Sequence, residues 1–236
     1  RTGTDVSQAS ARWLADLATA CGASVDLQPV RCDRVEPLRS GLRLGDRFID
    51  GLPMFDAEFT GADGIRGRLG PAWSDAPIWV VEYACWGGPG IGIGRREMLE
   101  LRRAGKARAI VKITNGPEPG LAPRNAELLP DRVGPPTVRV GSEHRAELLR
   151  AAENRSEATL FAHVRHVPTE DYNVVARIEG TNSRRPALGI MTPQGGWWTV
   201  TAERVGGLVC WLRILEALCR RRPERTVNFV ASCGHE

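Results

Sequence analysis

The fold class is decided by the stretch Thr226-Val-Asn-Phe-Val-Ala-Ser-Cys-Gly-His-Glu236. Its residues 226–231 are mainly β-branched and apolar, which predicts a buried strand that ends in a small polar turn. Before it, the pattern predicts strands over 172–178 and 186–191 and a helix over 205–220. The final third therefore reads strand, strand, helix, strand, which indicates α/β layering.

The rest of the chain divides into two regions that differ in composition and pattern. Residues 6–22 have an amphipathic pattern that predicts a helix, and residues 24–29 alternate as a short strand. From Leu38 to about Pro123, Gly and Pro are frequent and the apolar runs are short, as in a β-rich module. The further elements that we expect are strands over 78–81, 107–113, 136–140 and 159–167, and helices over 95–104 and 142–152.

Composition excludes several classes of protein. Of the 236 residues, 42% are hydrophobic and 25% are charged, which excludes disorder along the whole length. No apolar run approaches the roughly 18 residues of a membrane span. Lys and Arg exceed Asp and Glu by 32 to 28, but the Arg220–Arg225 cluster has no aromatic partner, so no nucleic acid is expected.

Six cysteines are present, without a CxxC pair or zinc-finger spacing. An even number permits disulfides, but a chain of this length does not need them. We therefore expect reduced thiols and a cytoplasmic location, with a secreted or periplasmic one left open.

Two glycine-rich stretches are candidates for binding. Gly87–Gly94 precedes a helix, but its order is not G-x-G-x-x-G and Pro89 interrupts it, so a surface loop is favoured over a phosphate site. Trp197 and Trp198 follow Gly195-Gly196, and paired indoles either pack under a loop or contact a ligand.

Three acid or imidazole side chains are candidates for chemistry. Glu203 stands at the start of the helix over 205–220, where it either caps the helix or binds a metal or substrate. His235 and Glu236 follow the last strand, and the carboxyl ends of strands are where α/β folds place chemistry. A solvated chain end is the alternative for this pair.

The order of these features resembles the co-catalytic zinc aminopeptidase superfamily, peptidase family M-twenty-eight. The resemblance rests on Arg1-Thr-Gly-Thr before a helix, Tyr172-Asn-Val-Val-Ala-Arg-Ile-Glu-Gly180, Glu203-Arg-Val-Gly-Gly207, and the closing stretch to Glu236. Residues 78 to about 166 resemble a protease-associated insert. The resemblance implies an α/β fold: part of a mixed-sheet aminopeptidase-like domain with a β-rich insert. The expected boundaries are 1–38 and 167–236 for the aminopeptidase-like domain and 39–166 for the insert.

The resemblance also implies a site, which this chain carries incompletely. In the family a His-x-Asp zinc motif follows the strand over 187–191, whereas Met191-Thr-Pro193 stands here. The resemblance gives Glu203 and Glu236 as metal ligands and puts His235 at the general-base position, where a His can act near neutral pH. A two-zinc hydrolase needs about three protein ligands per ion, so zinc binding is doubtful. The remaining ligands of the family lie beyond Glu236, so we expect the chain to be part of a longer catalytic domain.

Two functions follow as alternatives. One is a divergent metallopeptidase-like hydrolase of peptides or small amides, with Thr192, Trp197 and Trp198 at the rim of its cleft. The other is a non-catalytic binding or scaffolding module with the same fold. Either requires Glu203, His235 and Glu236 to converge, because the turns after Met191 and Ala231 should follow neighbouring parallel strands.

Overall fold

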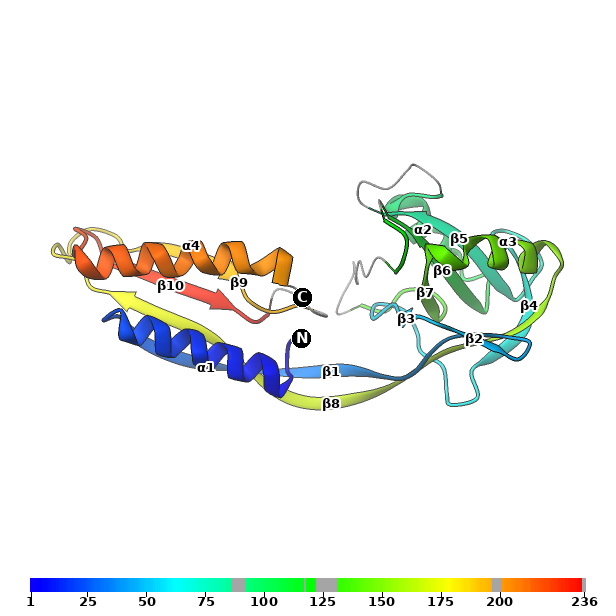
Figure 1. The fold of residues 1–236 in the computed structure, drawn as a ribbon, viewed down its shortest axis with the longest axis horizontal. Helices are drawn as coiled ribbons and strands as arrows, with labels where there is room; N and C mark the ends of the chain where they lie inside the picture. Colours follow the sequence, from blue (N-terminus) through cyan, green and yellow to red (C-terminus); the bar gives the residue numbers. More distant parts are fainter. Residues whose placement is uncertain (86–91, 117, 122–130, 197–200, 235–236) are drawn as a thin grey trace. The chain divides into compact units, whose positions relative to one another are not determined.

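A computed structural model describes residues 1–85, 92–116, 118–121, 131–196 and 201–234. The fold is α/β, as the sequence predicts, and within these residues ten strands form a mixed sheet (Figure 1). The elements are α1 (Asp5–Ala20), β1 (Ser24–Leu44), β2 (Arg47–Asp50), β3 (Leu52–Pro53), β4 (Ile65–Pro71), β5 (Ile78–Ala84), α2 (Arg95–Ala104), β6 (Ala109–Asn115), β7 (Thr137–Gly141), a short 3-10 turn (Ser142–His144), α3 (Arg145–Glu153), β8 (Glu157–Ile178), β9 (Leu188–Pro193), α4 (Thr201–Arg220) and β10 (Val227–Ser232).

The chain forms two compact units. The first unit comprises Arg1–Arg34 and His166–Glu236, and the second comprises Val35–Arg165. The long strands β1 and β8 each contribute residues to both units. That the second unit is a protease-associated-like insert stays an expectation.

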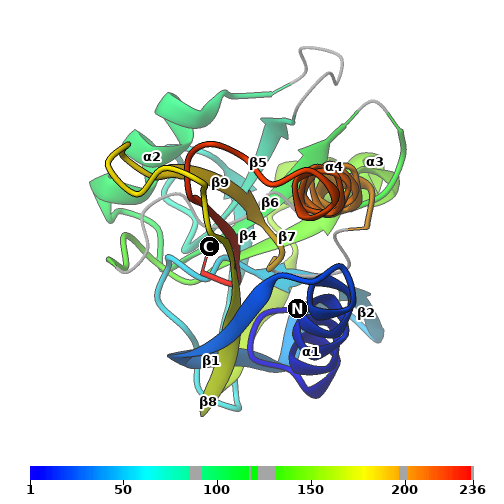
Figure 2. The ribbon, with the colours of Figure 1, turned by 90° about the vertical axis from the view of Figure 1, so that its left-hand side faces the viewer.

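In the first unit the strand order is β1, β8, β10, β9. β10 pairs antiparallel with β8 and parallel with β9. The helices α1 and α4 lie along one face of these strands (Figure 2). Because β10 alternates buried and half-buried residues, Val227, Phe229 and Ala231 point toward the helices.

The start of α1 is fastened to β8. Thr4 caps the helix by accepting a hydrogen bond from the Ser7 amide at 3.2 Å. The buried Asp171 carboxylate accepts from the Gly3 amide and the Ser7 hydroxyl, both at 2.7 Å. Gly3 has φ of +73°, and a Cβ there would lie 2.5 Å from the Thr169 methyl group, so only glycine fits this approach. The bond to Thr4 satisfies one amide that the helix start leaves unpaired, and the bonds to Asp171 hold the segment against β8.

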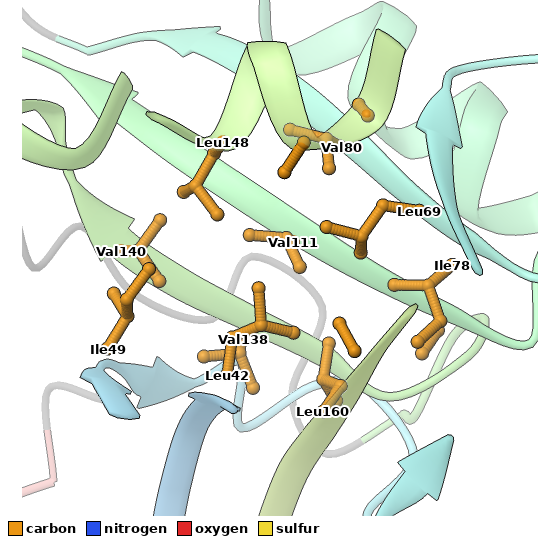
Figure 3. Packing of buried hydrophobic residues seen from close by; sticks show 14 of the residues in the cluster. Leu42, Ile49, Leu69, Ile78, Val80, Val111, Val138, Val140, Leu148 and Leu160 are labelled. Atoms are coloured by element: carbon orange, nitrogen blue, oxygen red, sulfur yellow. The ribbon is translucent and has the colours of Figure 1, made fainter. Parts of the chain in front are cut away.

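The second unit is built on four parallel strands in the order β4, β5, β6, β7. Along β5, residues 78 and 80 join one buried cluster, while residues 79, 81 and 83 join another. The first cluster lies under α3, whose Leu148 joins Val111 and Val80 in it (Figure 3). The second lies against Met98 and Leu101 of α2. Both faces of β5 are buried, which explains its continuous apolar sequence.

A buried ion pair holds α2 in place. The Arg102 guanidinium donates to both carboxylate oxygens of Asp56, at 3.0 and 3.3 Å, and to the Val133 carbonyl. The contact is bidentate, and because both charged side chains are buried, it is shielded from water. The sequence pattern predicted the bounds of α2 but gave no sign of this partner.

Two expectations about strands are wrong. The predicted strands over 159–167 and 172–178 are one strand, β8, and the predicted strand over 24–29 continues to Leu44 as β1. β1 contains Pro29 and Pro37, and β8 contains Pro168, although proline removes a ladder donor and often ends a strand. Here β1 and β8 pair with each other and tolerate them.

The sequence of α4 predicts a wide apolar surface that is covered on most sides, because Leu208, Trp211, Leu212, Leu215 and Leu218 recur at helical spacing. Trp211 and Leu215 are buried, with Leu208, Leu212 and Leu218 half-buried beside them. On the outward side Val205, Val209 and Ile214 are 45%, 50% and 42% exposed. The described part of the chain therefore covers one face of this helix, and the expectation of wider cover is wrong. No helix in the described part of the chain is long and apolar enough to span a membrane.

Candidate functional site

The candidate site lies where β9 and β10 end. These parallel strands are in register to their last residues, since Thr192 pairs with Ala231 and Pro193 with Ser232. The two segments remain hydrogen-bonded just beyond the paired residues, because the Gln194 amide donates to the Ser232 carbonyl at 2.8 Å. The segments that follow the two strands therefore leave from the same edge of the sheet, as the sequence predicted.

Thr192 is buried at this edge and faces α4. A Cβ at position 207 would lie 2.5 Å from the Thr192 hydroxyl oxygen, so Gly207 allows the helix to approach β9. Gly207 thus has a packing reason, whereas a Cβ at Gly206 would meet nothing within 4 Å. Gly207 brings the first turns of α4 against the end of β9.

Glu203 and Arg204 form the charged part of the site. Glu203 lies in the first turn of α4, and its side chain is 51% exposed. Its Oε1 lies 3.0 Å from Nη1 of Arg204, whose side chain is only 7% exposed. The Arg204 Nε donates to the Gly195 carbonyl at 3.0 Å, which fixes the guanidinium inside the turn after β9.

The beginning of the chain borders the same edge. The Thr2 amide donates to the Gly196 carbonyl at 3.0 Å, and the Thr2 hydroxyl donates to the Cys233 carbonyl at 3.1 Å. Sequence reasoning missed both Thr2 and Arg204. Arg204 stands next to Glu203 in the sequence, but nothing in the pattern indicated that it turns inward, and Thr2 is more than 200 positions from Cys233.

Cys233 follows β10 at the candidate site and is buried. Burial raises the pKa of its thiol to about 11, with a smaller contribution from the Asp171 carboxylate. Its amide donates to the Asn173 side-chain oxygen at 2.9 Å. The thiol is therefore protonated at neutral pH, and a protonated thiol is a poor nucleophile.

The structure describes two of the six predicted site residues. Thr192 and Glu203 both lie at this edge, on β9 and in the first turn of α4. Trp197, Trp198, His235 and Glu236 lie outside the described residues. The convergence of Glu203, His235 and Glu236 therefore stays a prediction.

The described donors at this edge do not fit a zinc pair. Zinc sites use Cys, His and carboxylate ligands, whereas the residues that end β9 are Met191, Thr192 and Pro193. Glu203 lies against the buried Arg204 guanidinium, whose positive charge opposes a divalent cation nearby. Among the described residues, no group of three or more His, Cys, Asp or Glu side chains could hold a metal ion.

Comparison with known proteins shows which solved structures have a similar fold. No protein-family model matches this sequence, and no curated protein matches it. The fold is similar to that of BSAP, a zinc aminopeptidase from Bacillus subtilis, with a TM-score of 0.75 over 99% of this chain at 19% identity. This chain has part of an aminopeptidase fold.

Two further solved structures share the aminopeptidase fold. They are a peptidase of the M-twenty-eight family from Shewanella amazonensis (TM-score 0.70, 13% identity, 98% of this chain) and an aminopeptidase from Aneurinibacillus (TM-score 0.65, 14% identity, 99% of this chain). The match covers 56% of the Bacillus chain, 60% of the Shewanella chain and 58% of the Aneurinibacillus chain. This chain thus spans little more than half the length of the structures it resembles. At these identities the likeness shows the fold, and the activity has to be argued from the site.

Proposed function

We propose that this chain is a non-catalytic relative of the zinc aminopeptidases, whose fold serves as a binding or scaffolding module for a peptide or protein. The observation that carries the proposal is the ion pair at the start of α4. The carboxylate that the resemblance assigns to a metal is 3.0 Å from a buried guanidinium. A guanidinium keeps its positive charge at any pH relevant to a cell.

The neighbouring positions support the same proposal. Thr192 and Pro193 stand in the segment where the family carries its His-x-Asp motif, and Thr192 is occupied in packing against α4. A proline side chain offers no donor atom to a metal. The strands at this edge thus keep the order of the aminopeptidase fold, while the described side chains here pack against α4 and do not offer metal ligands.

The second candidate is a divergent hydrolase of peptides or small amides. It is favoured by the parallel register of β9 and β10, which brings the segments after both strands to one edge, and by Glu203 on the helix between them. In this function Glu203 and Glu236 would hold zinc, which would activate water and act as a Lewis acid toward an amide carbonyl. His235 would accept a proton at its ring nitrogen, and Thr192, Trp197 and Trp198 would contact the substrate.

Metal content separates the two functions. The full-length protein that contains this chain is purified, dialysed against a chelator, loaded with zinc and washed, and its zinc is measured by mass spectrometry alongside hydrolysis of leucine p-nitroanilide. We expect far less than one zinc per chain and no hydrolysis above the buffer. About two zinc ions per chain, with hydrolysis, would overturn the proposal.

A pair of glutamate variants sharpens this experiment. Glu203→Ala removes the carboxylate at the candidate site, and Glu224→Ala removes an exposed carboxylate that pairs with Arg185 elsewhere in the first unit. For a binding module, neither variant changes zinc content or hydrolysis. A loss of both in Glu203→Ala alone would support the hydrolase.

A further inference from the structure

One tight turn of the second unit holds a tryptophan in a strained backbone conformation. At the end of β4 the Ser74 amide donates to the Pro71 carbonyl at 3.2 Å, and the Ser74 hydroxyl donates to the same oxygen at 2.7 Å. Trp73 is the third residue of this turn and has φ of +68°. Such a position normally carries Gly or Asn, because a bulky side chain with positive φ is disfavoured. The turn is therefore held in this conformation by its surroundings.

A second residue with a strained backbone contacts the same turn. Among the described residues, Arg155 is the other non-glycine residue with positive φ, at +52°. Its guanidinium binds both carboxylate oxygens of Asp75, at 2.6 and 2.9 Å. This bidentate contact fixes the segment two residues after Trp73. Backbone strain in the described part of the chain is thus concentrated at one place.

The Trp73 indole contacts two neighbours and is still largely exposed. Its ring centroid is 5.4 Å from that of Trp79, which is buried and donates its Nε1 hydrogen to the Ser74 carbonyl at 3.2 Å. The Lys106 ammonium lies 5.4 Å from the Trp73 ring, within cation–π range. Even so, 57% of Trp73 is exposed. A rigid, exposed indole is the kind of residue that contributes most to protein interfaces.

The surroundings of Trp73 are cationic. Arg103, Lys106 and Arg108 are exposed on the segment that ends α2 and begins β6. The Arg108 amide donates to the Pro77 carbonyl at 2.8 Å, which places that segment beside the tryptophan turn. The nearest carboxylate on the turn, Asp75, is occupied by Arg155. A partner that docks here would gain from carrying negative charge.

We propose that Trp73, together with Lys106 and Arg108, forms a docking surface for an acidic peptide segment of a partner protein. An apolar or prolyl side chain of the peptide packs on the exposed part of the indole, and its carboxylates contact the two cations. A peptide fits better than a nucleic-acid strand, because strand binding uses several successive stacking rings, and the neighbouring Trp79 is buried. This surface lies in the second unit, so the proposal goes beyond the site at β9 and β10.

Fluorescence anisotropy of the whole chain with a labelled Glu-Pro repeat peptide tests the proposal. Trp73→Gly removes the indole and also relieves the positive-φ strain, so its thermal stability should be unchanged or higher while its affinity falls about tenfold or more. Lys106→Glu should weaken binding similarly, and added salt should weaken it further. Trp13→Ala, at a 60% exposed indole on α1, is the matched control and should bind like the parent chain.

Three results would overturn the docking surface. One is no saturable binding of the peptide. Another is equal affinity of Trp73→Gly and the parent chain, with a lower melting temperature in the variant, which would mean that the indole only covers Trp79. The third is tighter binding of a single-stranded DNA of matched length than of the peptide.

Discussion

Trp211 is the residue on which the core of the first unit depends most clearly. It is 1% exposed, and its ring meets Phe229 of β10 edge-to-face, with centroids 5.5 Å apart. Among the described residues, its buried Nε1 has no hydrogen-bond partner. The indole therefore contributes packing, while its N–H group carries a desolvation cost.

Substitutions at this position should differ sharply. Trp211→Ala should lower the free energy of unfolding by about 3 to 5 kcal/mol, because it leaves a cavity between α4 and β10. Trp211→Phe should cost only about 1 kcal/mol, since it keeps the edge-to-face contact and removes the unpaired N–H group. Urea unfolding followed by circular dichroism measures both. A loss below about 1 kcal/mol in Trp211→Ala would contradict the packing described here.

Cys233 predicts a pH dependence of stability. Its pKa is about 11 in the folded chain against 9.0 for an unperturbed thiol, so the folded state favours the protonated form. The unfolded chain then releases its proton first as pH rises, which means that this contribution is fully present below pH 9 and is lost between 9 and about 11. The free energy of unfolding should fall across that window, and the fall should be smaller in Cys233→Ala.

Alkylation gives a second readout of the same thiol. In mildly alkaline iodoacetamide the exposed Cys210 should react within minutes, while buried Cys233 should react only with unfolding. Peptide mass spectrometry resolves the two sites. Fast modification of Cys233 in the folded chain would show that the thiol is neither buried nor protonated.

At the scale of elements, the edge strand β9 and the outward face of α4 each expose apolar side chains. β9 pairs with β10 alone among the described strands, and its Leu188 and Met191 are 47% and 75% exposed. On α4, Val205, Val209 and Ile214 are exposed. An uncharged strand edge beside an apolar helix face favours association with other polypeptides.

A charge on this edge should therefore reduce association. We expect light scattering of the 236-residue chain to rise with concentration, and Met191→Lys to reduce that rise, because a lysine on a strand edge opposes pairing. Val6→Lys is the control, since Val6 is 73% exposed on α1. Equal scattering by Met191→Lys and the parent chain would show that this edge takes no part.

The long strands β1 and β8 continue through residues that locally favour the end of a strand. Pro168 predicts a break in β8, and the acid pair after it suggests a turn. In the structure Asp171 is instead a buried anchor for the start of α1. The strand continues because β1 lies alongside it, and that partner is more than 110 positions away.

At the scale of the whole molecule, each unit has its own core. The helices of the first unit share one buried cluster with β8 and β10, and the parallel strands of the second unit have clusters on both faces. Either unit therefore has enough buried apolar surface to be compact by itself. The match to about half of each solved aminopeptidase chain includes both units, because it covers nearly all of this chain.

The sequence by itself determined the α/β class, the bounds of α2, and the inward face of α4 around Trp211 and Leu215. It also determined that β9 and β10 end at one edge. These features depend on local periodicity and on the order of elements, both of which can be read directly from the sequence. Only the tertiary structure decided that β1 and β8 are continuous, that the outward face of α4 is open, and that Arg204 turns inward to hold Glu203. Each of these depends on which distant segment lies alongside, and no local pattern of apolar and charged residues carries that information.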